Sequence, residues 1–376
     1  RVVIPSGSTD ELREHIQARL KESAPRPSVN RVVFVFSGFG SQWAGMGAAL
    51  FHQYPAFAES MKRCQLQFST LADWSLIDVM SGGDRSRSVD DGDVGGPLVC
   101  AIQISLAALW RSWGVTPHAI AGHSYGDPAA AYVGGTISLR CALRVALQWG
   151  DAISKIHHQG GIVLAQISET DLRERFGALA DSLDIAGVNG DDSLVLAGTL
   201  DVLAELQERL SADGIWNARA NIPAAAHSRQ LDQFVPHFRT AVGELHPTES
   251  SIPIFTCLNG RQEDCLDIDY FARSMREPCR LDKMMESLFE FGADVFIELS
   301  PHPLLQKPMQ QLAKRAGVSS TFLSSMRRGQ SATEVLSNAR VSLFELGVQS
   351  AESLHGDPCW VGKANQSLPI AVPVSA

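Results

Sequence analysis

The pentapeptide Gly122–Gly126, which reads Gly-His-Ser-Tyr-Gly, constrains this chain more than any other stretch. It follows the small apolar run Ala119–Ala121 and precedes the helix-forming run Ala129–Tyr132. A strand, a G-x-S-x-G turn and a helix make a nucleophile elbow, in which two glycines permit the sharp bend that lifts a serine hydroxyl above a sheet. Pro128 suits the first turn of the following helix, because its missing N–H loses no partner there. The sequence therefore predicts that Ser124 is a nucleophile.

The composition is that of an ordinary globular chain. Of its 376 residues, 45% are hydrophobic and 19% are charged, which leaves room for one large core or two modest ones. The net charge of −9 argues against nucleic acid as a partner. The apolar stretch 97–110 is interrupted by polar residues and is too short to span a bilayer, so no membrane association is expected.

Cysteine usage and the first residues indicate the setting of the chain. The seven cysteines are odd in number and include no C-x-x-C pair, so we expect reduced, mostly buried thiols in a cytoplasmic protein. The chain starts at Arg1 and lacks the apolar core of a signal peptide, which is typical of a fragment of a longer chain. No metal and no tightly bound cofactor are expected.

The order of predicted elements divides the chain into two linkers, a larger body and a smaller subdomain. The body opens with an apolar strand expected to be buried on both faces. The subdomain alternates as βαββαβ, the order of a ferredoxin-like fold. The boundaries are 1–30 for the first linker, 31–160 and 222–346 for the body, 161–221 for the subdomain and 347–376 for the second linker.

Hydrophobic periodicity and turn residues place the helices before and within the first half of the body. Helices are expected at 10–23, 43–52, 56–68, 97–113 and 138–156, with a polar loop at 81–96. On the last of these helices the 3.6-residue period turns Trp149 inward and leaves Arg140 and Arg144 toward solvent.

A serine nucleophile needs a base, and neutral imidazole is the usual one because its pKa lies near the operating pH. His123 adjoins Ser124 in the strand, so its side chain is expected on the opposite face, as a structural residue. The pair 157–158 and His302 are expected in loops. His227 comes just after the chain passes from the subdomain back to the body, where a side chain can reach into a cleft between the two. The pattern favours His227 without deciding for it.

A glycine-rich turn, Ser37–Trp43, follows the first strand of the body. At the carboxyl end of a central strand, such a turn lies beside the elbow and offers a backbone N–H to an oxyanion. We therefore interpret it as part of the site.

Five stretches occur in a recognisable order. They are Phe36–Trp43, Gly122–Asp127, Asn189–Gly190, Ala226–Ser228 and Phe296–Pro303. This series resembles that of the acyltransferase domains of modular type I polyketide synthases, and the spacing holds from about residue 31 to 346. The resemblance implies an α/β fold, with an α/β-hydrolase-like body, an inserted ferredoxin-like subdomain and a cleft between them.

The resemblance also implies roles for the residues that match. An acyl-CoA would acylate Ser124, while His227 would act as base and then as acid toward the departing thiol. A backbone carbonyl orients the histidine in this family, so no third acidic residue is needed. The backbone N–H groups of Phe39 and Tyr125 would hold the oxyanion. The acyl group would pass to the phosphopantetheine thiol of an acyl carrier protein, beside the neighbouring domains of a larger synthase.

Departures from the family pattern concern the substrate. In members that use extender units, an arginine pairs with the free carboxylate of the malonyl group, and this chain has Trp149 at that position. Because a buried carboxylate without a partner costs several kcal/mol, dicarboxylic donors are expected to be disfavoured. Gly96 stands where a glutamine is common. Small residues precede the matching histidine, which opens space for bulk; they are Ala224, Ala225 and Ala226.

Tryptophan at this position resembles the loading-module acyltransferases of erythromycin and avermectin synthases. We therefore expect a short, uncharged donor such as propionyl-, isobutyryl- or 2-methylbutyryl-CoA. Two smaller departures are Phe39, where glutamine is usual, and Asp127–Pro128, where glutamate and a hydrophobic residue are preferred.

Three other functions remain open. An extender-unit transferase is disfavoured by Trp149. A serine esterase or thioesterase would use water as acceptor and an acid between serine and histidine in sequence, for which Asp184 is a candidate. A catalytically idle docking domain would not need the serine and histidine. An acidic carrier protein calls for a basic patch; Arg273, Arg276 and Arg280 lie at helical spacing, but a solvated helix face explains them equally well.

Overall fold

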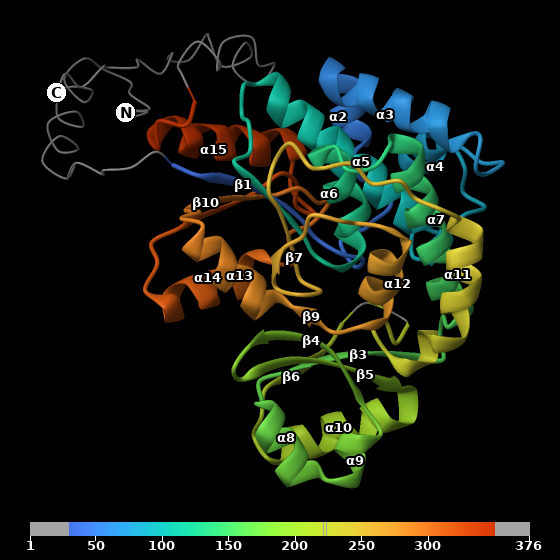
Figure 1. Ribbon diagram of the computed structural model, residues 1–376, viewed down its shortest axis with the longest axis vertical. Coiled ribbons are helices and arrows are strands. Elements are labelled where there is room, and N and C mark those ends of the chain that lie inside the picture. The colour runs from blue at the N-terminus through green and yellow to red at the C-terminus, as the bar shows by residue number, and fades with distance from the viewer. Residues whose placement is uncertain (1–29, 221, 223, 350–376) are drawn as a thin grey trace, which may run out of the picture.

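The structure is a computed structural model that describes residues 30–220, 222 and 224–349 (Figure 1). Almost all of the two predicted linkers, including the helix expected at 10–23, lies outside the described residues. Within them the chain forms two separate sheets.

The larger sheet has six strands in the order β11-β10-β1-β2-β7-β8. All neighbours are parallel except β7 and β8, which form an antiparallel pair. Its strands are β1 Val32–Phe36, β2 Ala119–Gly122, β7 Ile254–Thr256, β8 Arg261–Gln262, β10 Val295–Glu298 and β11 Thr321–Ser324. Every residue of β1 is buried, as the apolar run predicts for a central strand with helices on both faces.

The two faces of the larger sheet are covered by different helices (Figure 1). Because side chains alternate along a strand, Phe34 packs into the cluster that includes α3, α5, α6 and α7, while Val33 and Val35 pack against α13 and α14. The helices of this body are α2 Ala48–Gln53, α3 Pro55–Phe68, α4 Leu76–Ser81, α5 Gly92–Ser112, α6 Asp127–Gly134, α7 Leu139–Lys155, α11 Val235–Val242, α12 Ile268–Arg276, α13 Leu281–Glu290, α14 Gln306–Ala316 and α15 Ala332–Glu345.

Helix α5 corrects the prediction of a loop up to residue 96 followed by a helix at 97–113. The helix begins at Gly92, and Pro97 lies inside it. The early glycines serve close packing instead of a loop, because a Cβ on Gly92 would stand 2.4 Å from the carbonyl oxygen of Gly150 on α7. The helix predicted at 43–52 likewise starts only at Ala48, after turns in which Gly45 and Gly47 adopt positive φ.

By length and apolar composition, α5 is the one helix in the described part of the chain that is suited to cross a membrane. Most of it is nevertheless inside the protein, since 89% of its most apolar 18-residue stretch is buried. Its hydropathy is therefore that of a core helix in contact with α3 and α7.

The smaller sheet has the order β6-β3-β5-β4-β9 and lies below the body in Figure 1. Its first four strands and three helices come from the segment predicted as βαββαβ, with the predicted 169–179 helix divided at Gly177. The fifth strand, β9, comes from the body and pairs parallel with β4, which the sequence did not predict. The elements are β3 Gly160–Ala165, α8 Glu169–Phe176, α9 Ala178–Asp181, β4 Asp184–Gly190, β5 Ser193–Thr199, α10 Leu200–Ala212, β6 Asn217–Arg219 and β9 Cys279–Arg280.

Candidate active site

The predicted strand, turn and helix around Ser124 are present as β2, a single 3₁₀ turn over Ser124–Gly126, and α6. Ser124 adopts a φ of 55°, which non-glycine residues rarely adopt. Both glycines are required by close approach, since a Cβ on Gly122 would lie 2.4 Å from Asp127 Oδ1 and one on Gly126 would lie 2.1 Å from the carbonyl oxygen of Phe36. The elbow thus holds Ser124 at the carboxyl end of β2.

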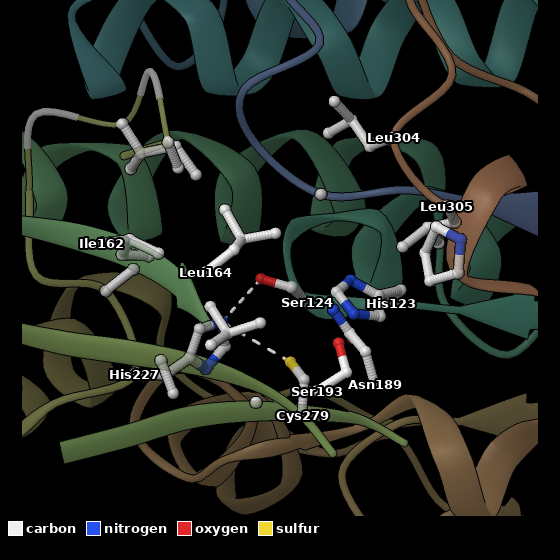
Figure 2. A pocket seen from close by; sticks show the side chains of 18 of the residues that line it. His123, Ser124, Ile162, Leu164, Asn189, Ser193, His227, Cys279, Leu304 and Leu305 are labelled. Carbon is white, nitrogen blue, oxygen red and sulfur yellow. Dashed lines mark hydrogen bonds between the residues drawn. The ribbon is translucent and has the colours of Figure 1, made fainter. Parts of the chain in front are cut away.

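His227 faces Ser124 across the space between the two sheets (Figure 2). Its Nε2 lies 2.7 Å from Ser124 Oγ, and its Nδ1 lies 2.9 Å from the carbonyl oxygen of Glu277. Because a carbonyl oxygen only accepts, Nδ1 carries the proton and Nε2 is left to accept from the serine hydroxyl. A backbone carbonyl, and not a carboxylate, therefore orients this imidazole.

Two buried thiols lie beside this pair. Cys279 Sγ is 3.6 Å from His227 Nε2, and the backbone N–H of Ser124 donates to Cys257 Sγ over 3.3 Å. Burial lowers the pKa of His227, but the charge and hydrogen bond of Cys279 and the Glu277 carbonyl outweigh it and raise the pKa. The hydrogen bond from Cys257, together with the two nearby imidazoles, holds the pKa of Cys279 well below its ordinary value despite burial.

The glycine-rich turn after β1 lies against the nucleophile, as predicted. A Cβ on Gly38 would stand 3.2 Å from Ser124 Cβ and 3.4 Å from its Oγ. The turn is held from below by Gln103, whose amide donates to the carbonyl oxygen of Ser37 over 2.7 Å. The rings of Phe39 and Tyr125 lie 5.9 Å apart beside Ser124, so the two residues expected to hold an oxyanion are neighbours.

A cavity of about 520 Å³ opens in front of Ser124 between the two sheets. Its apolar lining residues come from both sides and include Phe39, Trp149, Ile153, Ile162, Leu164, Ala186, Val195, Ile222, Ala226, Leu304, Leu305 and Leu312. Its hydrogen-bonding and charged lining residues beyond Ser124 and His227 include Gln166, Asn189, Asp192, Ser193, Lys307, Gln311 and Arg315. A cavity of this size and lining suits a small, mostly apolar group.

Trp149 lies on the inward face of α7, as predicted from its spacing, and is 1% exposed. Its ring stands 5.2 Å from that of Tyr125 and 6.4 Å from that of His227, and it lines the cavity. Arg140 is exposed, whereas Arg144 is half-buried and donates to the carbonyl oxygen of Glu244 over 3.4 Å.

Three of the residues predicted to bind substrate do not line the cavity. Gly96 is buried in α5, where a Cβ would stand 2.0 Å from Tyr125 Oη, so it makes room for that tyrosine. Ala224 is buried in the main core, and Ala225 packs in a small cluster with Ile162. Only Ala226 of the three alanines lines the cavity, because consecutive side chains in an irregular segment point in different directions.

The expectation that the side chain of His123 lies on the face opposite Ser124 is wrong. β2 ends at Gly122, and the turn at Ser124 breaks the alternation of a strand, so His123 lines the same cavity as Ser124. Its buried Nδ1 makes no hydrogen bond within the described residues, and burial lowers the pKa of the ring. The other histidines weighed from the sequence do not line this cavity: the rings of His157 and His158 stack 4.1 Å apart, and His302 accepts from the backbone N–H of Arg328.

Asp127 is the first residue of α6 and is fully buried. Its Oδ2 accepts hydrogen bonds from the hydroxyls of Tyr270, over 2.8 Å, and Ser274, over 2.6 Å. Burial raises the pKa of this carboxyl to about 7, although the two hydroxyls oppose the shift. Asp127 therefore connects the start of α6, behind the nucleophile, to α12 through two buried hydrogen bonds.

The arginines considered for a carrier surface are each engaged in ion pairs. Arg273 pairs with Glu277 and Arg276 with Asp232, and Arg280 pairs with Asp282. The six cysteines among the described residues are free, in agreement with the predicted reduced thiols; they are Cys64, Cys100, Cys141, Cys257, Cys265 and Cys279.

Comparison with known proteins places this architecture in a family. The pattern of the acyl transferase domain matches residues 33–352. Polyketide synthase GfsB of Streptomyces halstedii is 36% identical over 341 residues, which are 88% of this chain and 6% of that protein. Erythronolide synthase EryA2 of Saccharopolyspora erythraea is 33% identical over 287 residues, which are 76% of this chain and 8% of that protein. The chain thus spans a small part of the synthases that it matches.

Two solved structures are similar over most of the chain. A loading acyltransferase from the avermectin modular polyketide synthase is 32% identical, with a TM-score of 0.78, and the match covers 83% of this chain and 99% of that one. The acyltransferase domain from module 8 of the salinomycin polyketide synthase is 31% identical, with a TM-score of 0.78, and the match covers 94% and 84%. By its sequence, its mixed α/β fold and its matched length, the chain belongs to the family of acyltransferase domains of modular polyketide synthases.

Proposed function

We propose that this domain loads a short, uncharged acyl group, branched or unbranched, from acyl-CoA onto the phosphopantetheine thiol of an acyl carrier protein. The observation that carries the proposal is the hydrogen-bonded series Ser124, His227 and the Glu277 carbonyl at the edge of a largely apolar cavity. We take the protein to be a cytoplasmic domain of a larger synthase, with an α/β-hydrolase-like body and a ferredoxin-like subdomain.

In the first half-reaction, His227 Nε2 takes the proton of Ser124 Oγ while the oxygen attacks the thioester carbonyl of the donor. The backbone N–H groups of Phe39 and Tyr125 stabilise the oxyanion in this proposal. The C–S bond then breaks, and the imidazolium returns its proton to the departing CoA thiolate. The second half-reaction runs the same steps in reverse, with the carrier's thiol as nucleophile and Ser124 as leaving group.

The charge of the cavity favours a monocarboxylic donor. Trp149, next to His227, presents an indole ring where a dicarboxylic donor would need a cation. The lysine and arginine side chains that line the cavity among the described residues are only Lys307, which is exposed, and Arg315, which is paired with Asp192. A second carboxylate next to Trp149 would lose hydration against an uncharged ring that cannot neutralise its charge.

The similarity to a loading acyltransferase of the avermectin synthase supports a starter unit over an extender unit. A serine hydrolase is less well supported, because the Nδ1 of His227 meets a carbonyl oxygen and not an acid. Asp184, the candidate acid, instead accepts from Arg229 over 3.0 Å.

The test lets six acyl-CoA donors compete for acylation of Ser124. An equimolar mixture of malonyl-, methylmalonyl-, acetyl-, propionyl-, isobutyryl- and 2-methylbutyryl-CoA is incubated with the protein, and the intact mass is measured beside a Ser124→Ala control. We expect a stable monocarboxylic adduct that the control lacks. A malonyl-type adduct would contradict the donor class, and release of CoA without an adduct would indicate a hydrolase.

A further inference from the structure

A cluster of soft ligands lies at the foot of the catalytic pair. One ligand atom each of His123, Cys257 and Cys279 lies within 4.8 Å of the other two. All three side chains are largely enclosed, and none forms a disulfide. Two thiolates and an imidazole are the ligands that Zn²⁺ prefers, and a divalent ion with two thiolates has no net charge, which suits a buried position.

The surroundings of the cluster resemble those of a metal centre. Ser124 donates its backbone N–H to Cys257 Sγ, the kind of hydrogen bond that supports a metal thiolate. The buried Nδ1 of His123 has no hydrogen-bond partner within the described residues and is therefore available as a ligand atom. The thiols of Cys257 and Cys279 also contact each other, so both can share one ion.

His227 is the candidate for a fourth ligand. It stands at the edge of the cluster, outside the group of ligand atoms that all lie within 4.8 Å of one another, so its ring would move toward the ion on binding. Its Nε2 lies 3.6 Å from Cys279 Sγ, and tetrahedral zinc with Zn–S of about 2.3 Å and Zn–N of about 2.0–2.1 Å separates sulfur and nitrogen ligands by about 3.5 Å. Its Nδ1–H already donates to the Glu277 carbonyl, which is the second hydrogen bond that a metal-bound histidine makes.

We propose that His123, Cys257 and Cys279 form a binding site for a thiophilic divalent cation such as Zn²⁺, that His227 completes it, and that the bound ion stops acyl transfer. Binding releases to solvent whatever protons the two sulfur atoms and His227 Nε2 carry, and it occupies the Nε2 lone pair of His227. That lone pair is the one that accepts the proton of Ser124, so the metal-bound enzyme has no base. The inhibitory part of this inference rests on the proposed function, whereas metal binding does not.

The binding experiment uses the full chain, kept reduced and freed of metal with a chelator that is then removed. Zn²⁺ is titrated, and Co²⁺ is added separately as a spectroscopic probe. We expect one ion per chain and a thiolate-to-cobalt charge-transfer band. Cys279→Ser and Cys257→Ser should each weaken binding by at least the roughly 10–100-fold that outer ligand partners contribute. The matched control is Cys265→Ser, which changes an exposed thiol outside the cluster.

Two results would overturn the site: no binding by the wild-type chain, or equal binding by wild type and both cluster variants. Since a cysteine variant can fail through misfolding, His123→Asn provides a second test, because it leaves both thiols in place and should still lower zinc affinity at least tenfold. Unchanged affinity in that variant would remove His123 from the site.

The activity experiment follows acyl-enzyme formation, each variant being compared with its own metal-free rate. One equivalent of Zn²⁺ should slow wild type and Cys265→Ser at least tenfold, EDTA should restore the rate, and Cys279→Ser should resist. Tight binding without slowing would contradict the inhibition. If metal-free wild type forms no acyl-enzyme at all, the proposed function fails, while the binding titration still reports on the metal site.

Discussion

The two sheets contribute to the cavity in different ways. The larger sheet acts through the end of a strand, since Ser124 stands just beyond β2 on a turn that two glycines make possible. The smaller sheet acts through a face: Ile162 and Leu164 of β3 line the cavity, while Val163 and Ala165 between and after them pack under α8 and α10.

We infer from this difference that the strand end determines the catalytic chemistry and that the sheet face determines which acyl group is selected. At the strand end, the position of Ser124 Oγ depends on positive φ angles at Ser124 and His227. It also depends on the glycines of the elbow, where the neighbouring atoms leave no room for a Cβ. Such a region tolerates almost no substitution. On the sheet face, by contrast, shape and apolar area decide, and a change of one side chain alters which acyl group fits. The predictions below test this division, from the largest expected effect to the smallest.

The strongest test of the strand end is His227→Asn. Asparagine tolerates a positive φ better than most residues, so the backbone at this position, with φ of 54°, is kept while the base is lost. Acyl-enzyme formation should fall by about 10²–10⁴-fold. Stopped reactions analysed by intact mass give the rate, and His246→Asn, at a largely exposed histidine, is the control. Wild-type acylation by His227→Asn would mean that another group is the base.

Asp127 tests the buried polar groups behind the elbow. Its folded-state pKa of about 7 lies above the ordinary 3.8, so the folded state binds this proton more tightly than the unfolded state does. The free energy of unfolding should therefore fall as pH rises from about 4 to 7, by roughly 4 kcal/mol for the full shift.

Asp127→Asn keeps an oxygen for the Tyr270 and Ser274 hydroxyls and removes the titration. Denaturant unfolding at pH 5 and pH 8 measures the difference, which should largely vanish in this variant and persist in Asp90→Asn, at an exposed position. Equal pH dependence in wild type and Asp127→Asn would show that other groups cause it.

Trp149 connects the two regions, because it belongs to the body and lines the cavity that the small sheet closes. Trp149→Arg should increase malonyl loading relative to propionyl loading by about 10–150-fold, the value of a hydrogen bond to a charged group. Competition between the two donors measures this ratio. Trp149→Phe controls for lost volume and should keep the monocarboxylic preference; an unchanged ratio in Trp149→Arg would refute the role of this position in selectivity.

The sequence predicted those parts of the site that depend on local backbone chemistry. The elbow carries its own signal, because glycines at 122 and 126 are needed wherever such a turn is built. The inward face of α7 follows from a 3.6-residue period that burial obeys, with Ala142, Val145 and Trp149 all enclosed. His227 was predicted as the base from the order of the motifs, because the residues around it in the sequence favoured it without deciding for it.

Contacts between distant segments could not be predicted in this way. The sequence predicted a loop at Gly92 and Gly96 because glycine disfavours helices. Both positions lie in a helix and need glycine because Gly150 and Tyr125 pack directly against them. Cys257 lies beside His123 because β7 pairs with β2 in the larger sheet, and Cys279 joins them because β9 crosses from the body to the small sheet. No spacing rule for metal ligands joins positions so far apart in the chain.

The smallest effect compares two neighbours on β3 that point to opposite faces. Val163 is fully buried against the helices of the small sheet, so Val163→Ala should lower the free energy of unfolding by about 2 kcal/mol, from two lost methyl groups and the space that they leave. Leu164 is half-buried and faces the cavity, so Leu164→Ala should cost less than about 1 kcal/mol of stability. It should instead favour 2-methylbutyryl over propionyl, by about tenfold in the competition assay. If Val163→Ala shifts the donor ratio as much as Leu164→Ala does, selectivity depends on the rigidity of the sheet and not on the face that it turns to the cavity.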